Sequence, residues 1–232
     1  MIGVRGMQAL LFGAADHGDA ASLAARARRN RVRKFVELIA QARGPVRVLD
    51  VGGTDVFWRT HLDLLPAEIF VTVLNQDAER PASLPWMRYV QGDARDMHMF
   101  GSAEFDVCFS NSVIEHVGTF EQQLRMASEV RRVARGYFVQ TPNAYFPLEP
   151  HFLVPGWQFL PVALRASLLR RYDLGWMPRI EDPEGARAAV ESIQLLSARK
   201  MRRLFPDCEV YREKVGFLTK SVIAYRRIGA TA

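Results

Sequence analysis

The sequence is poor in cysteine and has no long apolar run. Cys108 and Cys208 are its only cysteines among 232 residues, which argues against a disulfide framework or a cysteine-ligated zinc site. No apolar run reaches the roughly 18 residues that a membrane-spanning helix needs. The apolar residues 7–15 run into Asp16 and Asp19, so we expect no secretory signal peptide. These absences predict a cytoplasmic protein with at most peripheral membrane contact.

Lysine is also scarce, because only four of the 31 basic residues are lysines. The net charge of +6 therefore comes from arginine. An arginine excess suits phosphate-bearing partners, but these arginines are scattered instead of forming one basic run. The 49% hydrophobic and 24% charged content is that of a globular protein, and the length suits one α/β domain.

Apolar periodicity predicts a helix followed by a buried strand. Val32, Phe35, Val36 and Ile39 recur at helical spacing within an N-terminal helical segment, residues 1–44. The sequence Gly44-Pro45 ends this helix. Residues 46–51 are short, apolar and β-branched, as expected of a buried parallel strand.

Strands and helices then alternate, which predicts βαβ units. We expect further strands at residues 70–74, 87–91, 105–110 and 137–140, and a helix opened by a capping box of Thr119 and Gln122. A helix over 197–205 and strands at 209–215 and 219–225 close the chain. The expected fold is a single α/β domain with a seven-stranded, mainly parallel sheet, helices on both faces and a final antiparallel hairpin. Its parts are a core (45–141), an inserted cap rich in Pro, Phe, Trp and Arg (142–195) and the last helix and hairpin (196–232).

Polar residues follow the predicted strands, where open parallel sheets bind their ligands. Two adjacent glycines let the backbone approach a ligand closely. The candidate residues, in chain order, are Asp50, Gly52, Gly53, Thr54, Asn75, Gln76, Asp93, Ala94, Ser110, Asn111 and His116.

The order of these motifs resembles the class I S-adenosylmethionine-dependent methyltransferases of the type 11-like set. The resemblance covers residues 45–145 and 195–225. Its motifs are Leu49-Asp50-Val51-Gly52, Gly92-Asp93-Ala94 and Phe105-Asp106-Val107 continuing to Ser110-Asn111 and Glu115-His116-Val117. The resemblance implies a Rossmann-like fold and S-adenosylmethionine as cofactor.

The resemblance also implies roles for the candidate residues. Asp50, Gly52 and Gly53 would hold the methionine part of the cofactor, Asp93 and Ala94 the adenine, and Ser110 and Asn111 would line the methyl-bearing end. Two departures stand out: the glycine loop is short, and Asn75 replaces the acid that grips the ribose, although an amide both donates and accepts. A nicotinamide-binding fold is disfavoured because no G-x-G-x-x-G element is present.

His151 and Glu149 follow the fifth strand and are the candidate catalytic residues. An imidazole suits a general base for a hydroxyl acceptor; the alternative is that both residues only fix the loop. His116 is expected in the cofactor pocket or at a helix start. Asp16, His17, His61 and His98 show no metal-ligand spacing, so no metal site is predicted.

The insert allows two interpretations. Its aromatic and leucine residues form either a small satellite core or a lid that receives an apolar, lipid-like acceptor, with arginines 165, 170 and 171 meeting an anionic group.

Three functions remain open. The first is methylation of a small-molecule, glycan or lipid acceptor, at oxygen. The second is RNA methylation, suggested by the arginines between residues 26 and 33. The third is a non-catalytic binder that retains the fold. The sequence predicts neither the acceptor nor the oligomeric state.

Overall fold

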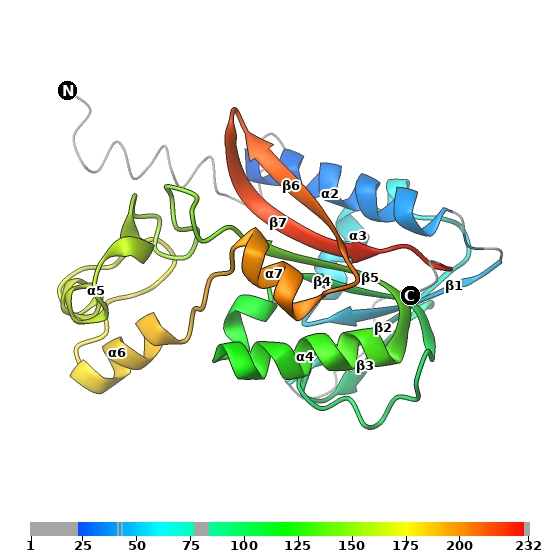
Figure 1. Cartoon of the computed structure of the whole chain (residues 1–232), viewed down its shortest axis with the longest axis horizontal. Helices are drawn as coiled ribbons and strands as arrows, with labels where there is room; N and C mark the ends of the chain where they lie inside the picture. Colours follow the sequence, from blue (N-terminus) through cyan, green and yellow to red (C-terminus); the bar gives the residue numbers. More distant parts are fainter. Residues whose placement is uncertain (1–22, 41, 43, 77–83, 230–232) are drawn as a thin grey trace.

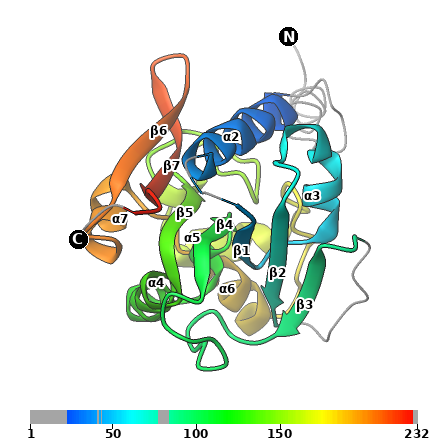
Figure 2. The same ribbon diagram turned by 90° about the vertical axis from the view of Figure 1, so that its right-hand side faces the viewer.

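The computed structural model describes residues 23–40, 42, 44–76 and 84–229. The segment 7–15, with Asp16 and His17, lies outside these residues. Seven strands form one sheet in the order β3-β2-β1-β4-β5-β7-β6 (Figure 1, Figure 2). The strands are β1 (Val46–Val51), β2 (Ile69–Asn75), β3 (Met87–Gln91), β4 (Phe105–Asn111), β5 (Ala134–Pro142), β6 (Glu209–Val215) and β7 (Leu218–Arg226). All neighbours are parallel except β5–β7 and β6–β7, which are antiparallel.

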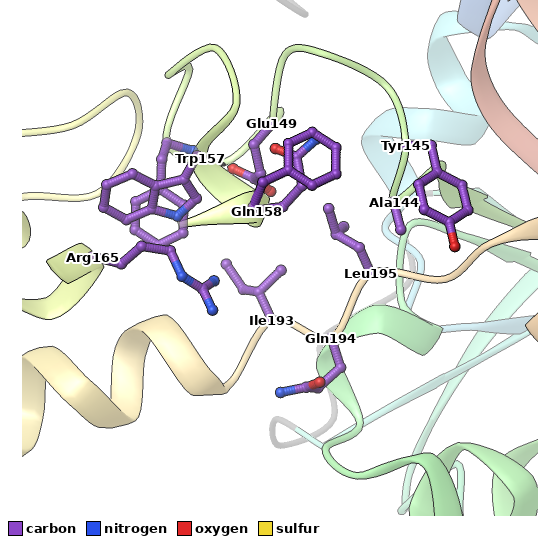
Figure 3. A pocket seen from close by; sticks show the side chains of 11 residues that line it. Ala144, Tyr145, Glu149, Trp157, Gln158, Arg165, Ile193, Gln194 and Leu195 are labelled. Carbon is purple, nitrogen blue, oxygen red and sulfur yellow. Dashed lines mark hydrogen bonds between the residues drawn. The ribbon is translucent and has the colours of Figure 1, made fainter. Parts of the chain in front are cut away.

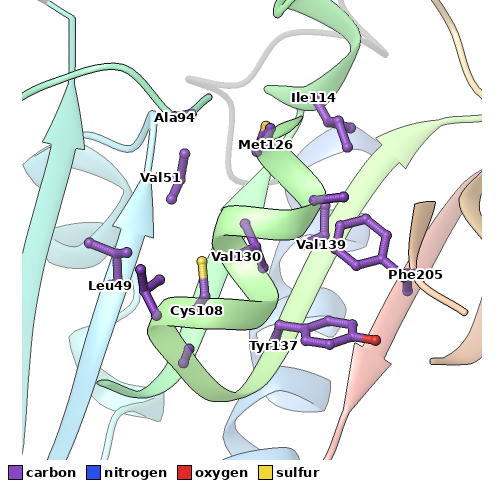
Figure 4. Packing of buried hydrophobic residues seen from close by; sticks show 14 of the residues in the cluster. Leu49, Val51, Ala94, Cys108, Ile114, Met126, Val130, Tyr137, Val139 and Phe205 are labelled. Atoms are coloured by element: carbon purple, nitrogen blue, oxygen red, sulfur yellow. The ribbon is translucent and has the colours of Figure 1, made fainter. Parts of the chain in front are cut away.

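Helices cover both faces of the sheet. The helix α2 (Leu23–Ile39) and the short α3 (Asp55–Thr60) pack one face through Phe35 and Trp58. The helices α4 (Phe120–Val133) and α7 (Ala198–Leu204) pack the other face, where Met126, Val130 and Phe205 are buried (Figure 4). The fold class predicted from the sequence is confirmed. None of the described helices has the length and apolar content to cross a bilayer.

The elements begin where the local chemistry predicts. Thr119 caps α4 through the expected capping box with Gln122, and the Ser197 side chain accepts from the backbone N–H of Lys200 at the start of α7. The strand β5 is longer than predicted, because it follows α4 without a loop at Ala134. Gly136 lies in this added part, where a Cβ would approach the carbonyl oxygen of Arg226 to 2.8 Å.

The chain between β5 and α7 builds its own small core. It carries α5 (Val162–Leu169) and α6 (Pro183–Glu191), which lie beside each other and away from the sheet (Figure 1). The buried residues Phe152, Trp157, Leu169 and Val190 form a separate cluster there. The two connections to the sheet run together, since the backbone N–H of Ala144 donates to the carbonyl of Leu196 over 3.0 Å. A satellite core, one of the two interpretations of the insert, is therefore present.

Candidate active site

The glycine turn after β1 is tightly packed. Gly52 has a φ of 75°, in the left-handed region that favours glycine. Its N–H donates to the carbonyl of Leu74 on the neighbouring strand over 2.8 Å. A Cβ on Gly53 would lie 1.7 Å from Oδ2 of Asp50. Both positions therefore require glycine, although the turn is shorter than in the family pattern.

Asp50 lies beneath this turn. Its side chain is buried, and Nε1 of Trp58 donates to Oδ2 over 2.7 Å. Burial raises the pKa of Asp50 to about 7, although the Trp58 hydrogen bond acts in the opposite direction. Asp50 thus supports the glycine turn as well as facing the neighbouring cavity.

A cavity of about 210 Å³ opens beside the turn. Asp50, Gly52, Gly53 and Thr54 line it together with Arg28, Phe109 and Asn111. A glycine cradle that any Cβ would fill, flanked by a carboxylate, an arginine and an amide, offers partners for both the ammonium and the carboxylate of an amino acid. These residues fit the methionine end of S-adenosylmethionine.

The polar residues after β2 and β3 continue along the same edge of the sheet. Nδ2 of Asn75 donates to the carbonyl of Gly53 over 3.4 Å, which joins it to the glycine turn. The N–H of Gly92 donates to the carbonyl of Asn75 over 2.9 Å, and Asp93 follows. Gln76 is exposed and Ala94 is buried. Asp50, Asn75, Asp93 and Asn111 therefore lie along one edge of the sheet, but only Asp50 and Asn111 of these four line the cavity.

Arg95 forms an ion pair with the carboxylate of Asp93. Its Nε lies 2.9 Å from Oδ1 and its terminal nitrogen 2.5 Å from Oδ2. The Arg95 side chain holds the pKa of Asp93 below its ordinary value. An adenine amino group would share this carboxylate with Arg95.

The end of β4 meets an arginine from α2. Ser110 is buried, and its hydroxyl donates to the carbonyl of Val51 over 3.3 Å. Arg31 donates to the side-chain oxygens of Asn111 and Gln140, and forms an ion pair of 3.0 Å with Glu213. The Arg31 side chain is only 10% exposed. The buried guanidinium of Arg31 thus lies beside Asn111, at the end of the site where the sequence predicts the methyl group.

Two histidines and two glutamates meet where the insert leaves the sheet. Oε1 of Glu149 lies 2.6 Å from Nδ1 of His151, and Nε2 of His151 lies 3.1 Å from Nε2 of His116. Glu115 is fully buried, and its Oε2 accepts from the hydroxyl of Thr141 over 3.0 Å. The structure therefore brings the predicted His151, Glu149 and His116 together and adds Glu115.

Burial and neighbouring charges shift the pKa values of this cluster. Burial raises the pKa of Glu115 to about 7. Partial burial and the adjacent His151 lower the pKa of His116 to about 4. Burial lowers the pKa of His151, but Glu149 and Glu115 outweigh it, so the net shift is upward. Perturbed groups gathered in this way are typical of functional sites.

A second cavity, of about 260 Å³, lies in the insert next to Glu149. Figure 3 shows Trp157, Gln158 and Arg165 of the insert on one side and Ile193 and Leu195 of the returning segment on the other. Nε1 of Trp157, Oε1 of Gln158 and Nε of Arg165 are buried and have no hydrogen-bond partner among the described residues. Unpaired buried polar atoms beside aromatic walls indicate a place for an amphipathic ligand.

Several residues of these sites were not predicted. Trp58, Arg31 and Arg95 reach the site by packing, which no motif encodes. Glu115 precedes His116 in the sequence, but its burial and the hydrogen bond that it accepts from Thr141 have no local pattern. Of the three insert arginines, only Arg165 lines the cavity; Arg170 is exposed and donates to the carbonyl of Glu181.

Comparisons with known sequences give matches to the central part of the chain. Residues 49–139 match the sequence model of the family described as "Methyltransferase domain". An "uncharacterized protein" of Mycobacterium tuberculosis strain H37Rv is 31% identical over 99 residues, covering 43% of this chain and 32% of the relative. The match thus spans about a third of that relative's length.

Comparisons with solved structures show a similar fold. The CurJ carbon methyltransferase has a TM-score of 0.57 at 12% identity, covering 96% of this chain and 59% of that chain. A SAM-dependent methyltransferase from Methanosarcina mazei has a TM-score of 0.52 at 13% identity, covering 83% of this chain and 97% of that chain. At this level of identity the likeness shows the fold.

Proposed function

We propose that this chain, whose residues 49–139 match the family described as "Methyltransferase domain", is an S-adenosylmethionine-dependent methyltransferase that methylates an oxygen of an amphipathic acceptor held in the insert. The acceptor is a small molecule, glycan or lipid with an apolar body and a polar or anionic group. The observation that carries the proposal is that the histidine–glutamate cluster adjoins the insert cavity through Glu149, while the glycine turn and Asn111 line the cavity beside β1.

On the cofactor side, the chain binds and orients. S-adenosylmethionine supplies a methyl group already activated by its sulfonium. Asp50, the glycine turn, Arg28 and Asn111 would hold its methionine end. Asn75 and Gln76 would face the ribose, and Asp93 with Ala94 the adenine. Thr54 lines the same cavity, and Ser110 would position the turn through Val51.

On the acceptor side, the chain aligns a hydroxyl and assists the loss of its proton. The aromatic wall of Phe152 and Trp157 would hold the apolar body, and Arg165 an anionic group. Glu149 lines this cavity and accepts from His151, so the predicted catalytic pair would face the acceptor. Alignment of the reacting atoms is the main contribution that a protein makes to such a displacement.

The RNA alternative finds less support in the arginines of α2. Arg31 is engaged with Glu213, Arg29 pairs with Asp63, and Arg28 lines the cofactor cavity. These three side chains have partners or positions within the protein.

The test uses methyl-labelled S-adenosylmethionine with fractionated cell extract. Label is expected in the small-molecule, glycan or lipid fraction, and mass spectrometry of the product identifies the methylated atom. His151→Ala should lower turnover at least tenfold while calorimetry shows unchanged S-adenosylhomocysteine affinity. His98→Ala is the control, because His98 is exposed and its ring pairs with the exposed Asp96. Label in RNA, or no S-adenosylhomocysteine binding at millimolar concentration, would reject the proposal.

A further inference from the structure

Glu115, His116 and His151 offer three metal-ligating atoms at one point. One ligand atom of each residue lies within 4.8 Å of those of the other two. The two Nε2 atoms face each other at 3.1 Å. His116 is the most accessible of the three residues and His151 is half-buried, so an ion from solvent can reach the cluster.

The carboxylate of Glu115 lacks a partner on one side. Its Oε2 accepts from Thr141, but Oε1 is buried and has no hydrogen-bond partner among the residues that the structure describes. A buried polar atom left unpaired is unfavourable, and more so when it is charged. A cation between Oε1 and the two imidazoles would remove this penalty.

Glu149 orients His151 in the way that ligand histidines are oriented. It accepts from Nδ1 of His151 over 2.6 Å, and its other oxygen accepts from the backbone N–H groups of His151 and Phe152. A proton fixed on Nδ1 leaves the Nε2 lone pair free, and a carboxylate behind a ligating histidine is the usual outer partner at metal sites.

We propose that Glu115, His116 and His151 bind a divalent first-row transition-metal ion, with Glu149 as the positioning residue. Two imidazoles and one carboxylate suit Zn²⁺, Co²⁺, Fe²⁺ or Mn²⁺. Three protein ligands leave a position open, as in catalytic metal sites. The ligands come from two segments 35 residues apart, which is why the spacing of histidines in the sequence predicted no metal.

The role of the ion rests on the proposed methyl transfer. The acceptor hydroxyl would occupy the open position, where the ion lowers its pKa. The O–H bond breaks and the proton passes to water. The resulting oxygen anion forms the new O–CH₃ bond, and the electrons of the broken C–S bond return to sulfur. His151 then contributes as a ligand.

The experiment measures metal binding by the full chain after dialysis against a chelator. Co²⁺ should give absorption bands of a nitrogen- and oxygen-ligated site, and Zn²⁺ should co-elute at one ion per chain. Glu115→Gln keeps the shape and the Thr141 hydrogen bond but should weaken Zn²⁺ binding at least tenfold, as should His116→Ala and His151→Ala. Glu149→Gln should weaken it less, and His98→Ala should leave it unchanged.

S-adenosylhomocysteine affinity and the melting temperature of each variant show whether it is folded. The inference would be overturned if the folded wild type bound no added Zn²⁺ or Co²⁺. It would also be overturned if wild type and Glu115→Gln bound Zn²⁺ with equal affinity. Metal-free turnover at the full rate would also overturn it and would leave the proposed methyl transfer intact. Stoichiometric metal without S-adenosylhomocysteine binding would keep the site and reject the methyl transfer.

Discussion

Gly53 has no room for a side chain, because a Cβ would overlap the buried Asp50 carboxylate. We expect Gly53→Ala to destabilise the fold by about 1–3 kcal/mol, the usual range for overpacking. It should also weaken S-adenosylhomocysteine binding at least tenfold, because the turn must move. Gly101→Ala is the control, since its added Cβ would meet only Glu104 at 3.7 Å. Urea unfolding measures the stability and calorimetry the S-adenosylhomocysteine affinity. Equal values for Gly53→Ala and Gly101→Ala would contradict the prediction.

Asp50 should make stability depend on pH. Its folded pKa of about 7 lies above the ordinary 3.8, so its stabilising contribution is present below pH 4 and is lost as the pH rises through 7. Asp50→Asn cannot ionise and should gain stability relative to wild type across this window. The difference between these two pKa values corresponds to about 4 kcal/mol in the free energy of unfolding. Urea unfolding at several pH values without cofactor gives the difference.

A second aspartate provides a control of opposite sign. Burial raises the pKa of Asp207, but the Tyr137 hydroxyl, Arg131 and Arg226 outweigh it and lower the pKa. Wild type should therefore gain stability relative to Asp207→Asn as the pH rises. If the Asp50→Asn difference stayed flat from pH 4 to 8, the carboxylate would be less isolated from water than the structure shows.

At the scale of elements, Arg31 ties α2 to the sheet through Glu213 on β6 and Gln140 on β5. Arg31→Ala leaves Glu213, only 12% exposed, without this partner. Removing one member of a buried pair is strongly unfavourable, so we expect a loss of about 3 kcal/mol in urea unfolding. Arg33→Ala should change stability by less than about 0.5 kcal/mol, because Arg33 is exposed and contacts Asn30.

A double-mutant cycle separates this pair from general packing. Arg31→Met combined with Glu213→Gln should be more stable than the sum of the two single effects predicts, because each removes the other's unpaired charge. Strictly additive effects would show that α2 is held by its apolar face alone.

The elements differ in how well their sequences predicted them. Strands β1 and β3 match the prediction at both ends. Strand β1 is a short, apolar run rich in valine that follows Gly44-Pro45 and precedes two glycines, which is a distinctive pattern. The helices α5 and α6 were not predicted individually. Their apolar residues are interrupted by proline and arginine, and their stability depends on packing against each other around Leu169 and Val190.

At the scale of the whole molecule, the insert has a core separate from those of the sheet. Its buried cluster is small, so its amides should exchange hydrogen at lower opening free energy than those of β1, β4 and β5. Trp157→Ala should speed exchange in the insert and leave S-adenosylhomocysteine affinity unchanged. Trp58→Ala should lower that affinity, because Trp58 holds Asp50. If Trp157→Ala raised amide hydrogen exchange equally over the whole chain, the insert and the sheet would unfold as one cooperative unit, against this prediction.

The sequence predicted which edge of the sheet carries the candidate site residues. It did not predict which of their side chains contact one another. Parallel strands bring their carboxyl ends to one edge, so Asp50, Asn75, Asp93 and Asn111 could be placed there from chain order alone. The facing of His116 and His151, and the insertion of Arg31 beside Asn111, depend on loop paths and on packing across distant segments. Such contacts have no local pattern in the chain.

The hydrogen bond between Ala144 and Leu196 fixes the two ends of the insert side by side on the sheet. Whatever lies between these two residues can be lengthened, shortened or replaced while the register of β5 and β7 stays the same. On the proposed function, the insert selects the acceptor and the core binds the methyl donor. Exchanging residues 145–195 for those of another protein is then expected to change the acceptor and to leave binding of the donor intact.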